Sequence, residues 1–172
     1  MLTQRLRVAQ VIAAALLDRR ANSTLRRRVV MLDCDLNRHM TNSRYPDYLD
    51  LGRWDLLLRS GAALALLRAG CKPLVVELHL RFRRELRYGA RFELDSRITG
   101  FEGKAVRIEQ TFLRDRRVHA RAVVRSLVVQ RGKVVAPDAL RPFVVPALRI
   151  EADQVIDDPR TDGAQAAEAA HR

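Results

Sequence analysis

Apolar and polar side chains alternate over most of residues 76–130, and this pattern constrains the fold more than any other feature of the chain. The alternating runs are residues 76–82, 92–98, 106–112 and 118–130, with turns expected at 100–103, 115–116 and 131–133. A period of two is that of a β-strand with one buried face. The sequence therefore predicts four antiparallel strands in succession, of which the first is half-buried.

One amphipathic helix precedes these strands. Residues 46–69 carry apolar side chains at helical spacing. Pro46 suits a first helical turn, whereas Gly61 and Gly70 are expected to break and to end the helix. Residues 25–32 are expected to form a first strand. Because a five-stranded sheet must bury one face, and this helix is the only large apolar element available, we expect an α+β fold in which one antiparallel sheet wraps around one long helix.

The length of 172 residues fits a single domain. We expect the folded domain to span residues 21–150, and Pro137, Pro142 and Pro146 predict an irregular return over its surface. Residues 151–172 are first acidic and then rich in alanine, a composition that predicts a disordered tail.

Residues 1–20 are predicted to form an additional amphipathic helix. This helix could pack on its own domain, or it could lie on an anionic membrane surface. Its longest uncharged run, residues 8–17, is too short for a bilayer span. A signal peptide would need small residues where the charged residues 18–20 stand.

The formal net charge is +12, and only three of the 32 basic residues are lysines. Such a charge could serve nucleic acid, an anionic membrane or a phosphate-rich small molecule, or it could simply keep the surface soluble. We expect no nucleic-acid partner, because the arginines are scattered and aromatic residues make up only 5% of the chain. The two cysteines, Cys34 and Cys71, have the spacing of neither a disulfide scaffold nor a zinc site. We therefore expect a cytoplasmic protein, with the inner membrane face as an alternative location through residues 1–20.

The segment between the first strand and the helix carries the residues that could take part in catalysis. Asp33 and Asp35 would share one face if the strand persisted, and His39 and Asn42 follow shortly before the helix, where unpaired N–H groups collect. A carboxylate facing such N–H groups suits acyl transfer, because the N–H groups hold the carbonyl oxygen while the carboxylate attacks or activates water. The residues alone fit a capping role for these side chains at least as well.

The run Asp33-Cys34-Asp35-Leu36-Asn37-Arg38-His39-Met40-Thr41-Asn42, followed by Asp50-Leu51-Gly52-Arg53, resembles the 4-hydroxybenzoyl-CoA thioesterase-like branch of the hotdog superfamily. The resemblance implies a hotdog fold, hydrolysis of acyl-CoA thioesters, and no metal or redox cofactor. It also implies a homodimer, or a dimer of dimers, with active sites at the subunit interface.

In this resemblance Asp35 is the catalytic carboxylate, acting as nucleophile or general base, and the backbone N–H of Asn42 polarises the thioester carbonyl. His39 is either a general base or a hydrogen-bonding residue that orients the loop. Arg38 stands where the family has glycine, and Thr41 where the subgroup has asparagine. The expected substrate-binding residues are Arg38, Tyr45, Arg81, Arg83 and Arg84. A non-catalytic acyl-CoA-binding or lipid-binding protein on the same fold is the alternative.

Overall fold

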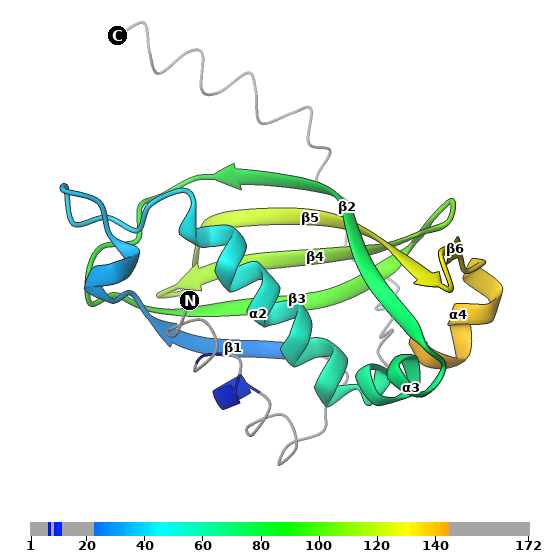
Figure 1. The fold of residues 1–172 in the computed structure, drawn as a ribbon. Coiled ribbons are helices and arrows are strands. Elements are labelled where there is room, and N and C mark those ends of the chain that lie inside the picture. The colour runs from blue at the N-terminus through cyan, green and yellow to red at the C-terminus, as the bar shows by residue number, and fades with distance from the viewer. Residues whose placement is uncertain (1–6, 8, 12–22, 145–172) are drawn as a thin grey trace, which may run out of the picture.

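The computed structural model of the chain describes Arg7, residues 9–11 and residues 23–144, with side chains described as far as residue 140 (Figure 1). Its elements are β1 (Ser23–Arg28), the 3₁₀ helix η1 (Met31–Asp33), α2 (Arg44–Arg59), α3 (Ala62–Arg68), β2 (Cys71–Phe82), β3 (Arg91–Glu102), β4 (Ala105–Arg114), β5 (Arg117–Gln130), β6 (Lys133–Val134) and α4 (Pro137–Val144). Arg7 and residues 9–11 are helical. The rest of the expected N-terminal helix and the expected tail lie outside the described residues.

The strands form one antiparallel sheet in the order β1-β3-β4-β5-β2, and the two-residue β6 pairs with β5. The sheet is curved, and α2 crosses one of its faces (Figure 1). This is the predicted α+β arrangement, with five long strands around a central helix. The predicted break at Gly61 is also present, because Gly61 has a φ of 77° and separates α2 from α3.

The core has two parts along the helices. Around the first half of α2, the buried rings of Tyr45 and Tyr48 pack against Phe92 and Phe112. Around Leu56 and α3, aliphatic side chains of β3, β4 and β5 form the second part. The aromatic part therefore lies under the start of α2, next to the segment that carries the sequence motif.

Gly52 marks a close approach between α2 and the sheet. A Cβ atom at this position would lie 2.6 Å from Oγ of Ser96, 2.8 Å from Nε2 of Gln110 and 2.9 Å from Cδ2 of Leu94. The Gln110 side chain is fixed there, since its Nε2 donates to Ser96 Oγ at 2.9 Å and to the Leu49 carbonyl at 3.0 Å. Only glycine lets the helix pack at this distance.

We expect Gly52→Ala to lower the free energy of unfolding by about 1–3 kcal/mol, the usual cost of forcing an extra methyl group into a packed core. Urea denaturation followed by circular dichroism measures this change. An unchanged unfolding midpoint would show that the sheet yields at this contact without cost.

Outside α2 and β2, three local predictions differ from the structure. The first strand ends at Arg28 rather than at residue 32, because the Asp33 side chain accepts a hydrogen bond from the Val30 N–H at 3.1 Å and favours the turn of η1 over an extended chain. The strand β3 continues through Gly100, where a register shift occurs, so the turn is confined to residues 103–104. Pro137 opens the helix α4 instead of an irregular segment, as proline suits a first helical turn.

The strand β2 is more exposed than its alternating sequence predicts. It lies at the edge of the sheet and pairs only with β5, while α2 packs mainly on β1 and β3. Its exposed apolar side chains are Leu74, Val75, Val76, Leu78 and Phe82. The prediction of a half-buried strand is therefore wrong for the described part of the chain, because α3 and Tyr45 of α2 contact β2 only in part and leave most of its apolar side chains exposed.

Candidate active site

The motif forms a tight loop between η1 and α2. Cys34 and Met40 pair as an isolated antiparallel bridge, and the Asp35 N–H donates to the His39 carbonyl at 2.9 Å. A second segment holds the loop from the side, since the Met40 N–H donates to the Leu86 carbonyl at 2.8 Å. The loop is therefore fixed by the backbone at both of its ends.

Asp35 lies exposed in this loop, whereas Asp33 is buried, because η1 and the bend after it turn the two side chains into different environments. Oδ1 of Asp35 accepts hydrogen bonds from the backbone N–H groups of Asn37 at 2.9 Å and of His39 at 3.1 Å. Oδ2 has no partner among the described residues. The carboxylate thus closes a turn with one oxygen and presents the other for chemistry.

His39 stabilises the loop through its side chain as well. Its Nε2 lies 3.2 Å from Oε2 of Glu85, and its backbone forms an isolated bridge with Arg87. These contacts fit the orienting role that the sequence allows for His39. They connect the loop to the segment that follows β2.

Asn42 lies exposed in the turn before α2, which begins at Arg44, two residues earlier than the position of Pro46 suggests. The Asn42 N–H donates to no acceptor within the described residues, whereas the Thr41 N–H before it donates to the Asp33 carbonyl at 2.8 Å. A free, exposed N–H at a helix start can bind the oxygen of an ester or thioester.

Arg38 adopts a left-handed conformation with a φ of 61°, which explains why the resembled family has glycine at this position. Its backbone carbonyl accepts a hydrogen bond from the Tyr88 N–H at 2.8 Å, and its guanidinium lies 5.6 Å from the centre of the Tyr88 ring. The cation–π contact with Tyr88 offsets part of the backbone strain. Arg38 therefore keeps a positive charge at the loop at a cost in stability.

We expect Arg38→Gly to be more stable than Arg38→Ala by about 1 kcal/mol, since both variants lose the cation–π contact and only glycine relieves the left-handed strain. Unfolding midpoints in urea compare the two variants directly. Equal midpoints would mean that the loop adjusts its backbone around either residue.

Sequence reasoning missed the cluster formed by Arg7, Asp33 and Tyr48. The Asp33 carboxylate, 1% exposed, accepts hydrogen bonds from the Tyr48 hydroxyl at 2.6 Å and from Nη2 of Arg7 at 3.0 and 3.2 Å. Burial and the bond to Asp33 raise the pKa of Tyr48 above its usual value. The guanidinium of Arg7 also lies 5.0 Å from the centre of the Tyr48 ring. The cluster fixes the base of the loop, and no local pattern in the sequence connects residue 7 with residue 33.

Tyr45 belongs to the hydrophobic core, and Cys34 packs against it. Tyr45 is 2% exposed and contacts the rings of Phe82 and Phe112 edge-on at 4.9 Å, and burial raises its pKa to about 12. In the single chain it is a core residue, so a substrate contact for Tyr45 stays a prediction.

Partial burial, together with the negative charges of Asp33 and Asp35, raises the pKa of the Cys34 thiol. A raised pKa disfavours a nucleophilic thiolate at this position.

The predicted basic cluster lies at the end of β2. Arg81, Arg83 and Arg84 are exposed, and Arg84 is fixed by a bond from Nη1 to the Val118 carbonyl at 2.8 Å. The backbone N–H groups of Arg83 and Arg84 both donate to the His119 carbonyl. The structure brings these arginines together at one strand end, and their role in binding CoA stays a prediction.

Within the described ranges, no group of three or more histidine, cysteine or acidic side chains is placed to hold a metal ion. None of the helices in the same ranges is both long and apolar enough to cross a membrane.

The family model of the thioesterase-like superfamily matches residues 29–148, so the chain belongs to this superfamily. The match includes the loop with Asp35, the central helix and the strands β2 to β6. The predicted family and hotdog fold are thereby confirmed. Membership supports acyl-thioester hydrolysis as the class of reaction.

Two curated relatives and one solved structure illustrate the similarity. Protein THEM6 of Xenopus laevis is 34% identical over 99 residues, which are 56% of this chain and 48% of that protein. The L-carnitine dehydrogenase/betainyl-CoA thioesterase of Agrobacterium fabrum is 32% identical over 81 residues, 47% of this chain and 17% of that protein. A hypothetical protein of Staphylococcus aureus, solved in complex with CoA, superimposes with a TM-score of 0.70 at 14% identity over 82% of this chain and 92% of that chain. The alignment thus spans about half the length of THEM6, and at 14% identity the structural similarity concerns the fold.

Proposed function

We propose that the chain hydrolyses acyl-CoA thioesters at the loop between η1 and α2. The observation that carries the proposal is that one backbone-fixed loop holds both Oδ2 of Asp35 and the N–H of Asn42, and that neither group has a partner among the described residues. The superfamily membership supports the reaction class, and the Agrobacterium relative has a CoA thioesterase in its name. The structural neighbour bound to CoA supports CoA as the carrier of the acyl group.

In this mechanism the Asn42 N–H donates to the thioester oxygen and stabilises the negative charge that develops on it. In one route Oδ2 of Asp35 takes a proton from the attacking water, and the CoA thiolate leaves and is protonated. In the other route Oδ2 attacks the carbonyl carbon and displaces the CoA thiolate, and water then hydrolyses the resulting anhydride to the free acid and Asp35. The amides of Asn37 and His39 hold Oδ1, so the carboxylate needs little reorganisation in the transition state.

The test is incubation of the purified chain with a panel of short-, medium- and long-chain acyl-CoAs and aromatic acyl-CoAs, with free acid and free CoA quantified by mass spectrometry. We expect equimolar acid and CoA from at least one member of the panel, well above the spontaneous rate. Tight binding of an acyl-CoA without release of CoA would instead support the alternative, a non-catalytic acyl-CoA-binding protein.

We further propose that the active protein is a homodimer that pairs through β2. This edge strand is twelve residues long and presents exposed apolar side chains, and such an edge tends to pair with another strand. A second copy would also cover Val76 and its neighbours, which the described elements leave exposed.

We expect sedimentation velocity to give twice the mass of one chain, and Val76→Lys to shift the protein to the monomer. Val76 is half exposed, so lysine costs the monomer little, but it would place a charge inside the proposed interface. Val134→Lys on β6, which also replaces an exposed valine, is the matched control and should stay dimeric. A monomeric wild type at micromolar concentration would refute pairing through β2.

A further inference from the structure

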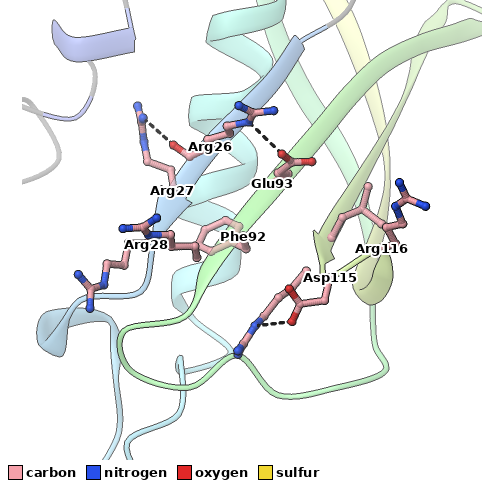
Figure 2. Close-up of a pocket in the computed structure, with 10 residues that line it drawn as sticks. Arg26, Arg27, Arg28, Phe92, Glu93, Asp115 and Arg116 are labelled. Atoms are coloured by element: carbon pink, nitrogen blue, oxygen red, sulfur yellow. Dashed lines mark hydrogen bonds and ion pairs between the residues drawn. The ribbon is translucent and has the colours of Figure 1, made fainter.

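A basic groove opens at the β1 side of the sheet, away from β2 (Figure 2). Three segments line it: Arg26–Arg28 at the end of β1, Arg91–Glu93 at the start of β3, and Leu113–Arg116 at the turn from β4 to β5. The groove has a volume of about 930 Å³, within the range of small-molecule sites.

The groove carries a large excess of positive charge. Its lining has six arginines and only two carboxylates, and both carboxylates already contact an arginine, Glu93 with Arg26 at 2.9 Å and Asp115 with Arg114 at 3.3 Å. The side chains of Arg91 and Arg116 make no hydrogen bond or ion pair with any described residue. Three arginines of the lining therefore have no carboxylate partner in the described part of the chain: Arg28, Arg91 and Arg116.

Arg27 adds a partly buried cation to this surface. Its Nη1 donates to the Arg26 carbonyl at 3.1 Å, but its buried Nε has no partner within the described residues. Burial lowers the pKa of Arg27, whereas the nearby Tyr48 and Asp55 act in the opposite direction. Because Tyr48 and Asp55 belong to α2, the charge of Arg27 is matched by a carboxylate outside the groove.

The turn at the rim of the groove keeps an arginine where glycine would be more stable. Asp115 and Arg116 both have left-handed backbones, with φ values of 51° and 61°, in a two-residue hairpin between Arg114 and Arg117. Asparagine and glycine are the residues that favour such a turn. Arg116 thus adds a positive charge to the groove at the expense of turn stability.

We propose that this groove binds the phosphate groups of a small molecule that carries at least two of them. One guanidinium group can bind two phosphate oxygens, so the arginines of the three segments can hold two phosphates at once. The CoA part of the substrate and a free nucleotide share this chemistry. A concave site of this size favours such a ligand over a long nucleic acid, which would need a continuous basic surface.

The groove lies at the same end of the sheet as the candidate loop. Nε of Arg28 donates to the Gly89 carbonyl at 3.0 Å, and the neighbouring Tyr88 N–H donates to the carbonyl of Arg38 in the loop. The predicted cluster at Arg81, by contrast, lies on β2 at the opposite edge. The two basic surfaces can therefore be tested separately.

The experiment is isothermal titration of the full chain with adenosine 3′,5′-bisphosphate. Arg91→Ala and Arg116→Gly should each raise the Kd about tenfold or more, the effect expected for loss of a charge-assisted hydrogen bond. Arg116→Gly should at the same time raise the melting temperature, so its weaker binding cannot come from unfolding. Arg68→Ala removes an exposed charge on α3 and should leave the Kd unchanged.

Three results would overturn the proposal: no binding of the bisphosphate by the wild type, wild-type affinity in both groove variants, or an equal loss in Arg68→Ala. Tighter binding of a single-stranded oligonucleotide through the same arginines would also overturn it.

Steady-state kinetics distinguish the CoA part of the substrate from a separate nucleotide as the ligand of the groove. A raised KM for acyl-CoA but not for acyl-pantetheine in Arg91→Ala assigns the groove to the substrate, whereas unchanged KM values with weaker bisphosphate binding assign it to a separate nucleotide. Neither of these two outcomes depends on whether Asp35 is the catalytic residue.

Discussion

Replacing Asp35 by asparagine is expected to lower kcat for acyl-CoA hydrolysis by about 10²–10⁴-fold, the usual contribution of a positioned acid–base group. The amide oxygen of asparagine can still accept the hydrogen bonds from Asn37 and His39, so the loop keeps its shape. The amide can neither attack the thioester nor take a proton from water. Steady-state release of CoA thiol measures the change, and KM should move much less than kcat.

Glu109→Gln is the matched control for this substitution. Glu109 lies on β4 and pairs with Arg107 at 2.8 Å, so its replacement also removes one partly exposed carboxylate. It should retain wild-type kcat. A similar loss in both variants would indicate a general effect of charge, and full activity in Asp35→Asn would remove Asp35 from the catalytic machinery.

Replacing Asp33 by alanine is expected to lower the free energy of unfolding by about 3–5 kcal/mol, the range for breaking a buried, hydrogen-bonded ion pair. The change leaves the Tyr48 hydroxyl and the guanidinium of Arg7 without their acceptor, and it removes the bond from the Val30 N–H at the N-cap of η1. Urea denaturation at constant pH measures the loss.

The matched comparison is Tyr48→Phe, which removes one hydrogen bond and keeps the ring that packs against Phe92. We expect a loss of about 1–3 kcal/mol for this variant, because the carboxylate keeps Arg7 as a partner. The double variant should lose less than the sum of both changes, since the two groups contact each other. Additive effects, or an unchanged stability of Asp33→Ala, would contradict the role of this cluster at the base of the loop.

The strands were predictable because their side chains alternate along the sequence, and a period of two leaves few other structures open. The alternation in residues 76–82 could not show what covers the strand. The burial of this strand depends on where α2 packs and on contacts with other chains. The described elements leave most of the apolar side chains of β2 exposed. The turn at Asp115 was recognised, but its left-handed backbone at Arg116 was not, because arginine gives no signal for that conformation.

The candidate site was predictable only in part. The resemblance identified Asp35, Arg38 and Asn42, whereas the residue spacing suggested equivalent positions for Asp33 and Asp35. The structure separates these two carboxylates, because η1 buries one of them and exposes the other.

Contacts between distant residues explain what sequence reasoning missed. Arg7 reaches Asp33 across 26 positions, and the basic groove joins segments from β1, β3 and the turn after β4. Such contacts depend on the fold of the whole chain, and a pattern of neighbouring residues in the sequence does not predict them.

The most direct test of the central claim is one assay of thiol release from acyl-CoA, run with wild type and Asp35→Asn at equal concentration and with both proteins shown to be folded. Our account predicts that the wild type releases CoA from at least one acyl-CoA well above the spontaneous rate, and that Asp35→Asn falls to within a small multiple of that rate. Equal rates for the two proteins, fast or slow, would contradict the assignment of Asp35 as the catalytic carboxylate.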